Sequence, residues 1–285
     1  MFQDALEKVT LENIYEHLFD LYTTRAPSEE HHLGYVDRSS DNITVILEKT
    51  GIDLRIKQSL SALNSLKQPS STGYVCWQTS IYLADWLLGD PKCPLKFLLD
   101  RKPIIVELGA GSSGILASVL GPLSATYLAT DHQKHLCRLL RLNTEENVQG
   151  NATLLDVDNQ AQLPNFESPF PKILFMEYDW EDRNALLVFK PVLNAFPHII
   201  LASDTIYNEY LVRYFVHSVA DLLGPYTVAV VGVQLRDESI LELFLECFLD
   251  SNLCVYSVPT LLLSEKLQRG FAVYCITQCN EDVTI

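Results

Sequence analysis

Three glycines and two acids are spaced so that a backbone turn could hold a ligand that contains a nucleoside. Gly109 and Gly111 open the pattern G-x-G-x-x-G directly after the apolar run 104–108, and Glu107 lies two residues before the first glycine. Glycines at these positions let backbone amides approach a ligand closely. Asp131 follows the turn by about 20 residues, a spacing at which an acid can bind a ribose diol.

The elements that must position these residues are predicted from the apolar pattern. From Gly73 on, apolar runs alternate with helical periodicity, which is typical of a doubly wound α/β sheet with helices on both faces. The seven expected strands are 104–108, 126–131, 172–180, 198–204, 226–235, 253–259 and 271–277. No helical pattern separates the last two, so we expect the last strand to lie antiparallel to its neighbours. The proline-containing segment 150–170 is expected to be irregular.

Polar and aromatic side chains follow the carboxyl ends of the first four expected strands. Because parallel strands end at one edge of the sheet, where ligands bind in this architecture, these residues should lie together. They are Glu107, Gly109 and Gly111 after the first strand, Asp131 at the end of the second, Asp179 and Trp180 after the third, and Ser203, Asp204 and Tyr207 after the fourth. Trp180, or Trp77 ahead of the first strand, could cover a flat surface of the ligand or could simply pack.

Two ligands fit the glycine pattern: a nicotinamide dinucleotide and S-adenosylmethionine. A pyrophosphate would gain nothing from the carboxylate of Glu107, whereas the ammonium group of the methionine portion would pair with it. Asp179 could accept a hydrogen bond from the adenine amino group. A dinucleotide-binding domain would also have a sixth parallel strand and a substrate domain, for which no chain remains. S-adenosylmethionine is therefore the predicted cofactor, and an NAD-dependent dehydrogenase is the alternative.

The composition limits the partners and the compartment. A formal net charge of −15 in 285 residues repels nucleic-acid backbones and attracts a basic protein. Seven cysteines are dispersed without zinc spacing, so we expect reduced thiols and no metal site. The first residues lack a signal-peptide core, and the best apolar run, 226–233, is too short to span a bilayer. These features predict a cytosolic or nuclear protein that binds no membrane.

An N-terminal extension, residues 1–70, is expected to precede the sheet domain, residues 71–285. Helical periodicity over 4–23 would bring its apolar residues to one face, and the runs 43–47 and 52–59 predict a β-hairpin. The extension is rich in acids, which we expect to dock a basic protein. Those least expected to serve a core role are Glu29, Glu30 and Asp37.

Short motifs of this chain resemble the signature of the seven-β-strand protein lysine methyltransferases. The matching motifs are ELGAG at 107–111, YDW at 178–180, SDTIYNEY at 203–210 and GYVCW at 73–77. The wider family often has Ala-Asp where this chain has Ser203-Asp204. Further segments, among them ENIYEHLFDLYT and VGVQLR, are similar to a fungal branch of the family that acts on ribosomal proteins. The resemblance extends from about residue 10 to the C-terminus.

The resemblance implies a Rossmann-like, seven-stranded methyltransferase sheet and methylation of a lysine on a basic large-subunit ribosomal protein in the cytoplasm. It implies S-adenosyl-L-methionine as the methyl donor and S-adenosyl-L-homocysteine as the product. We also expect the protein to be a monomer. Asp204 and Tyr207 are the expected catalytic residues at the lysine channel, although Asp204 could instead cap a helix and Tyr207 could pack. The expected cofactor-binding residues are Trp77, Glu107, Gly109, Gly111, Asp131, Asp179, Trp180 and Ser203. A non-catalytic, cofactor-binding chaperone of a ribosomal protein is the remaining alternative.

Overall fold

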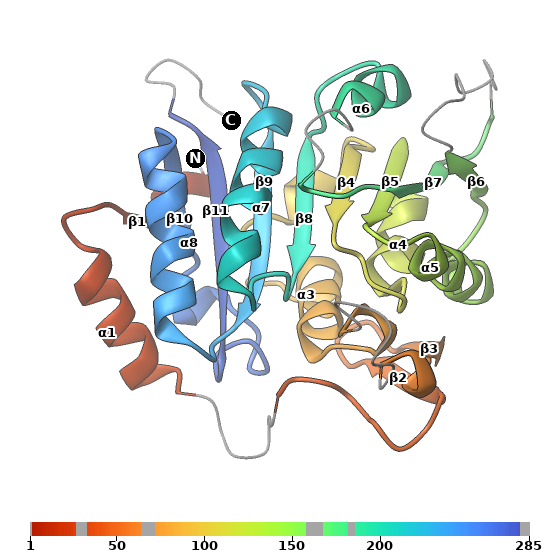
Figure 1. The fold of residues 1–285 in the computed structure, drawn as a ribbon, viewed down its shortest axis with the longest axis horizontal. Coiled ribbons are helices and arrows are strands. Elements are labelled where there is room, and N and C mark those ends of the chain that lie inside the picture. The colour runs from red at the N-terminus through yellow and green to blue at the C-terminus, as the bar shows by residue number, and fades with distance from the viewer. Residues whose placement is uncertain (1, 27–32, 64–71, 158–167, 182–185, 280–285) are drawn as a thin grey trace.

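The computed structural model describes residues 2–26, 33–63, 72–157, 168–181 and 186–279, which form an α/β fold around one large sheet (Figure 1). In these ranges the sheet has nine strands in the order β1-β10-β11-β9-β8-β4-β5-β7-β6, and β2 pairs with β3 in a separate hairpin. The strands are β1 (Glu7–Val9), β2 (Asn42–Leu47), β3 (Ile52–Lys57), β4 (Ile104–Leu108), β5 (Thr126–Asp131), β6 (Thr153–Val157), β7 (Lys172–Glu177), β8 (Ile199–Ser203), β9 (Val228–Gln234), β10 (Leu253–Ser257) and β11 (Phe271–Gln278).

The seven strands expected from the sequence are confirmed. Strands β7, β5, β4, β8 and β9 run parallel, which places the ends of β4, β5, β7 and β8 at one edge. Strand β11 lies between β9 and β10 and is antiparallel to both, as the missing helix before it predicts. The sheet therefore brings the predicted site residues to a common edge.

Two edge strands were not predicted. Strand β6 lies inside 150–170, so the expectation of irregular structure was wrong for Thr153–Val157. Strand β1 lies inside 4–23, where a single helix was expected, and α1 begins only at Ile14. Both segments pair with a distant strand, β7 or β10, and that pairing outweighs local periodicity. The proposed domain boundary near residue 70 falls in 64–71, outside the described residues, and stays a prediction.

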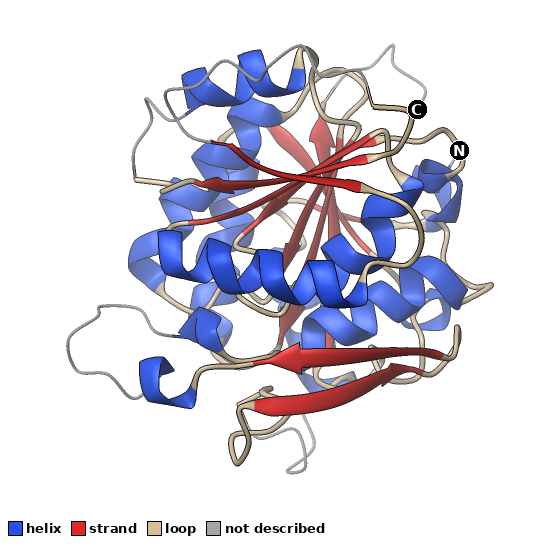
Figure 2. Ribbon diagram, turned by 90° about the vertical axis from the view of Figure 1, so that its right-hand side faces the viewer, coloured by secondary structure: helices blue, strands red, loops and turns tan. Residues whose placement is uncertain are grey.

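Helices cover both faces of the sheet (Figure 2). Along β4, Val106 and Leu108 face the core shared with α7 and α8, whereas Ile105 faces the core beneath α3 and α4. The helices are α1 (Ile14–Thr24), α2 (Leu60–Leu63), α3 (Gln78–Gly89), α4 (Ile115–Leu120), α5 (Lys134–Asn147), α6 (Leu186–Leu193), α7 (Glu209–Leu222) and α8 (Glu238–Asp250). Within the described ranges, none of these helices has the length and apolar character needed to cross a membrane.

Two asparagines of α5 hold the predicted hairpin against the sheet domain. Asn143 accepts a hydrogen bond from the Lys57 amide at 2.9 Å and donates one to the Lys57 carbonyl at 2.8 Å. Asn147 makes the same two bonds with Arg55, at 2.6 and 2.7 Å. Residues four apart on a helix are separated by about 6 Å along its axis, close to the two-residue spacing of a strand. The asparagines therefore complete the hydrogen bonding of an edge strand.

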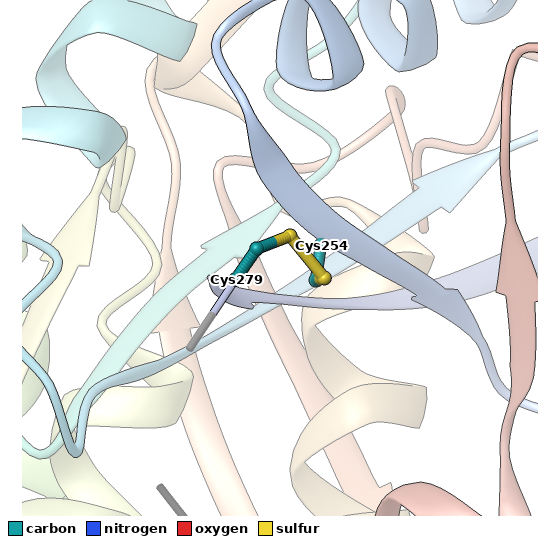
Figure 3. Close-up of a disulfide and its surroundings, with 2 residues drawn as sticks. All are labelled: Cys254 and Cys279. Atoms are coloured by element: carbon teal, nitrogen blue, oxygen red, sulfur yellow. A yellow bond between two sulfur atoms is a disulfide. The ribbon is translucent and has the colours of Figure 1, made fainter. Parts of the chain in front are cut away.

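Cys254 on β10 and Cys279 just after β11 form a disulfide (Figure 3). This corrects the expectation that all cysteines are reduced thiols. The antiparallel register pairs Cys254 with Thr277, two residues before Cys279, so the two cysteines are diagonal neighbours although 25 residues separate them in the sequence. Spacing alone could not show this pairing, because it depends on the register of the last two strands.

Candidate functional site

The strand ends open into a cavity of about 480 Å³. Nine of the ten predicted site residues line this cavity, and the tenth, Glu107, is not among its described lining residues. The nine are Trp77, Gly109, Gly111, Asp131, Asp179, Trp180, Ser203, Asp204 and Tyr207. The predicted clustering is therefore observed, while the individual roles of these residues stay predictions. Across the described ranges, no three His, Cys, Asp or Glu side chains are grouped so that they could hold a metal ion.

The glycine turn packs so closely against its neighbours that an added side chain would collide with them. Gly109 and Gly111 have φ angles of 68° and 61°, in the left-handed region that favours glycine. A Cβ on Gly109 would lie 2.7 Å from Cγ2 of Thr205 and 3.1 Å from the ring of Trp180. A Cβ on Gly111 would lie 3.3 Å from the carbonyl oxygen of Gly73. Glycine therefore fits both positions by its conformation and by its lack of a side chain.

Asp131 is fixed at the end of β5 by hydrogen bonds from the backbone. Its Oδ2 accepts from the Gly111 amide at 2.9 Å, and its Oδ1 accepts from the His132 amide at 2.8 Å. The same Oδ1 lies 3.0 Å from Nδ1 of His132, and this hydrogen bond raises the pKa of that histidine. A carboxylate oxygen has two lone pairs, so Oδ2 keeps one that can accept from a ligand hydroxyl. The geometry agrees with a ribose-binding role.

Asp179 and Trp180 lie in the turn that follows β7. Asp179 Oδ1 accepts from the Glu181 amide at 3.0 Å, which orders this turn. Trp180 packs edge-on against Phe215 with ring centroids 5.1 Å apart, and its ring lies against Gly109. Trp180 therefore both packs in the core and lines the cavity, so its two interpretations are compatible.

The carboxylate of Glu107 is buried and accepts a hydrogen bond within the protein. The residue is 2% exposed, and its Oε2 accepts a hydrogen bond from the Tyr127 hydroxyl at 2.7 Å. Burial raises the pKa of Glu107 to about 7, with the hydrogen bond from Tyr127 acting in the opposite direction. Alternation along β4 places this side chain on the face of Ile105, beneath the cavity edge. The side chain thus lies under the glycine turn, and its contact with the ligand stays a prediction.

Asp204 adopts a φ of 59° at the end of β8, and its carboxylate is paired with Arg236. Arg236 Nη1 donates to Oδ1 at 2.7 Å and Nη2 donates to Oδ2 at 2.5 Å, while the Asp204 side chain is 1% exposed. Asp204 does not cap α7, because Asn208 does so by accepting from the Tyr210 amide at 3.0 Å. Arg236 thus already supplies the positive charge that Asp204 was expected to attract.

Arg236 connects three parts of the cavity wall, and sequence reasoning gave it no role. Its guanidinium lies over the ring of Trp77, 5.3 Å from the centroid, and Nη2 donates to the Leu33 carbonyl at 2.9 Å. Trp77 Nε1 donates to the Thr72 carbonyl at 3.0 Å, and Thr72 Oγ1 donates to the Tyr207 hydroxyl at 3.1 Å. This network holds the side of the cavity where the methyl acceptor was expected.

Comparison with known proteins agrees with this architecture. Residues 55–248, more than half of the chain, match the family model described as lysine methyltransferase. Ribosomal lysine N-methyltransferase 5 of Vanderwaltozyma polyspora is 27% identical over 93% of this chain and 97% of its own. The proteins of the same name from Zygosaccharomyces rouxii and Lachancea thermotolerans are 30% and 29% identical, over 89% and 82% of this chain and 94% and 87% of theirs. These matches contradict the alternative of an NAD-dependent dehydrogenase. The chain belongs to the lysine methyltransferase family.

Proposed function

We propose that this lysine methyltransferase takes a methyl group from S-adenosylmethionine and transfers it to a lysine of a basic large-subunit ribosomal protein. The observation that carries the substrate proposal is the match to proteins named ribosomal lysine N-methyltransferase over nearly their whole length. The net charge of −15 favours a basic protein over a nucleic acid as the partner. We place the reaction in the cytoplasm and assign it to a monomer.

The cavity fits S-adenosylmethionine by its shape and by its hydrogen-bonding groups. Gly109 and Gly111 let the turn pack closely at the cavity wall, where their backbone would approach the ligand. Asp131 would accept hydrogen bonds from the ribose hydroxyls, and Asp179 would accept one from the adenine amino group. Trp77, Trp180 and Ser203 also line the cavity. When bound, this cofactor supplies a methyl group carried by a positively charged sulfonium.

The residues of the acceptor side would bind the lysine and favour its neutral form. A free lysine has a pKa of about 10.4, and only the neutral amine is nucleophilic. Burial disfavours the ammonium form, and the Arg236 guanidinium offsets the charge of the Asp204 carboxylate, which alone would favour it. The Tyr207 oxygen and the remaining lone pairs of Asp204 would accept from the amine. We assign Asp204 and Tyr207 to orientation of the amine, which is a large part of catalysis in an in-line displacement. Arg236 is a positioning residue that acts through Asp204.

Incubation of the pure protein with tritiated S-adenosylmethionine and large-subunit ribosomal proteins tests this function. The ribosomal proteins are taken from cells that lack the enzyme, so the acceptor lysine is unmodified. We expect label in a basic ribosomal protein, and mass spectrometry then identifies the lysine. Gly109→Val should abolish both the label and the binding of S-adenosylhomocysteine. Product binding by the wild type without label on any ribosomal protein would favour the chaperone alternative.

A further inference from the structure

Helix α1 buries one face and leaves a second apolar face uncovered. Tyr15 and Phe19, one helical turn apart, are 66% and 68% exposed, and Leu11 in the preceding turn is 56% exposed. The buried face comprises Ile14, Leu18 and Leu21. Large apolar side chains exposed in succession mark an interaction surface more often than isolated ones do. We call Leu11, Tyr15 and Phe19 the outer face of α1.

An acidic row runs beside the outer face. Glu12, Glu16 and Asp20 are all exposed, and each directly follows a residue of the outer face, so the two rows share their spacing. The sequence from 10 to 24 contains no Lys or Arg. Burial lowers the pKa of His17 to about 4, so this histidine is neutral at physiological pH. The helix therefore presents apolar and negative surface side by side, without positive charge.

The groove next to this row is negative as well. Glu16 and Asp20 line it together with Glu7, and Lys8 and the buried Arg25 are the cations among its described lining residues. Carboxylates thus outnumber cations in the groove. A basic side chain that extends past the acidic row would still meet an excess of negative charge.

Helix α1 lies outside α8 at the β1 edge of the sheet and descends toward the edge at which β8 ends (Figure 1). Leu33, which lines the cavity, follows Thr24 by nine residues. Nine extended residues span at most roughly 30 Å, which limits the distance between the end of α1 and the cavity wall. Phe19 lies five residues before Thr24, which adds about 7.5 Å of helix. A bound protein could therefore contact Phe19 and the cavity at the same time through an extended segment of about twelve residues.

We propose that the outer face of α1 docks a basic, amphipathic segment of the protein substrate at a point remote from the target lysine. This inference rests on the proposed function. Apolar side chains of that segment would cover Tyr15 and Phe19, while its Lys or Arg side chains would pair with Glu16 and Asp20. A second copy of this chain does not fit, because two such faces would place the same acids opposite each other on chains of net charge −15.

Remote docking affects substrate capture and leaves the chemical step unchanged. Once the segment is bound, the target lysine reaches the cavity as part of the same complex, which raises its effective concentration. Loss of docking should therefore raise KM for the intact protein and leave kcat unchanged. A short peptide around the target lysine lacks the docking segment, so its methylation should not depend on α1.

The experiment compares Tyr15→Ser/Phe19→Ser with the control Leu142→Ser/Tyr226→Ser, whose side chains are 53% and 67% exposed on other elements. The probes are the labelled ribosomal protein, purified from the mixture, and a short synthetic peptide around its labelled lysine. We expect the α1 variant to raise KM for the protein by about tenfold or more. Its kcat, its activity on the peptide, its affinity for S-adenosylhomocysteine and its melting temperature should match those of the control.

One kinetic result and one hydrodynamic result would each overturn the proposal. One is an equal KM for the α1 variant, the control variant and the wild type. The other is a wild-type dimer that Tyr15→Ser/Phe19→Ser converts to a monomer, which would assign the face to self-association. Glu16→Gln/Asp20→Asn tests the charged row separately, because it should reduce the salt dependence of KM without removing apolar contact.

Photo-crosslinking separates this proposal from the proposed function. A photoreactive amino acid replaces Phe19, or Tyr226 as the control, and the large-subunit ribosomal proteins are added. A basic ribosomal protein cross-linked only from position 19 supports docking, even if no methyl group is transferred and the proposed function fails. Methylation of a ribosomal protein that gives no cross-link from position 19 overturns docking while the proposed function stands.

Discussion

The guanidinium of Arg236 and the carboxylate of Asp204 form a two-bond ion pair on the acceptor side of the cavity. Gln234 contacts both partners of this pair. Its backbone N–H donates to Asp204 Oδ1 at 3.4 Å, and its side-chain Oε1 accepts from Arg236 Nη2 at 2.7 Å. The pair thus links the ends of β8 and β9 and holds Asp204 in a left-handed conformation that costs about 1–2 kcal/mol. Access of a lysine to Asp204 therefore depends on both partners.

Arg236→Gln should lower the free energy of unfolding by about 3–5 kcal/mol, because it leaves a buried carboxylate without its partner. Asp204→Asn/Arg236→Gln should lose less than the sum of the two single variants, with a coupling of at least about 1 kcal/mol. Urea unfolding of the four proteins measures this cycle. Additive losses would show that the ion pair does not hold the site together.

Tyr207→Phe should cut turnover by about tenfold or more while the affinity for S-adenosylhomocysteine stays unchanged. The variant removes only the hydroxyl, which accepts from Thr72, and the ring is 38% exposed, so stability should change by less than about 0.5 kcal/mol. Calorimetric titration and methyl-transfer kinetics give the two quantities. Tyr226→Phe, at a more exposed tyrosine, is the matched control. Equal losses of product affinity and rate would move Tyr207 to the cofactor side.

Gly109→Ala should abolish binding of S-adenosylhomocysteine, because the new Cβ collides with Thr205 and Trp180, which line the cavity, and forces the wall to shift. Gly51→Ala is the matched control, since Gly51 has a φ of 72° and nothing within 4 Å of the added Cβ. Both variants carry a backbone cost of about 1 kcal/mol, but only the first disturbs the residues that line the cavity. Thermal shift with and without the product distinguishes them. Equal product binding by the two variants would contradict the placement of the ligand.

The central strands could be predicted because each is a continuous apolar run buried on both faces. The site residues at their ends could be predicted because parallel strands share an edge. Strand β6 escaped prediction because four of its five residues are only half-buried or exposed, so no apolar run marks it. Strand β1 has three residues and forms only against β10.

Relationships between distant residues could not be read from the sequence. Glu107 meets Tyr127 because the register of β4 and β5 pairs Ile105 with Tyr127 on the same face. Arg236 meets Asp204 across 32 residues and two neighbouring strands. Each contact depends on strand order and register, which local patterns leave open. The residue types at the strand ends were therefore predictable, whereas their partners were not.

Glu107 should make the protein less stable as the pH rises. Burial raises its folded-state pKa to about 7, above the ordinary value of 4.5, so the folded state holds a proton that the unfolded state has lost. The free energy of unfolding should therefore fall between about pH 5 and pH 7 and level off above that range. Glu107→Gln mimics the protonated form and should lack this component. Urea unfolding over this range tests the difference, and parallel pH profiles for the two proteins would contradict it.

The disulfide between Cys254 and Cys279 predicts a specific thiol count. The protein purified without reductant and unfolded in denaturant should titrate five thiols, since five of the seven cysteines are free. Closing a loop with a separation of 25 residues should stabilise the oxidised protein by about 3 kcal/mol. The expectation from dispersed cysteines is seven thiols, so the titration separates the two assignments.

Cys279→Ser should therefore lower the free energy of unfolding by about 3 kcal/mol without reductant and have little effect in excess dithiothreitol. Cys247→Ser is the control, because Cys247 is a free, half-buried thiol and its replacement should respond equally under both conditions. The cytoplasm keeps most thiols reduced, so the bond would form there only if the folded strands hold its sulfurs together against glutathione. Alkylation of intact cells before lysis shows whether Cys254 and Cys279 are bonded or reduced inside the cell. Protein from such cells with all seven cysteines alkylated would show that the bond forms only after extraction.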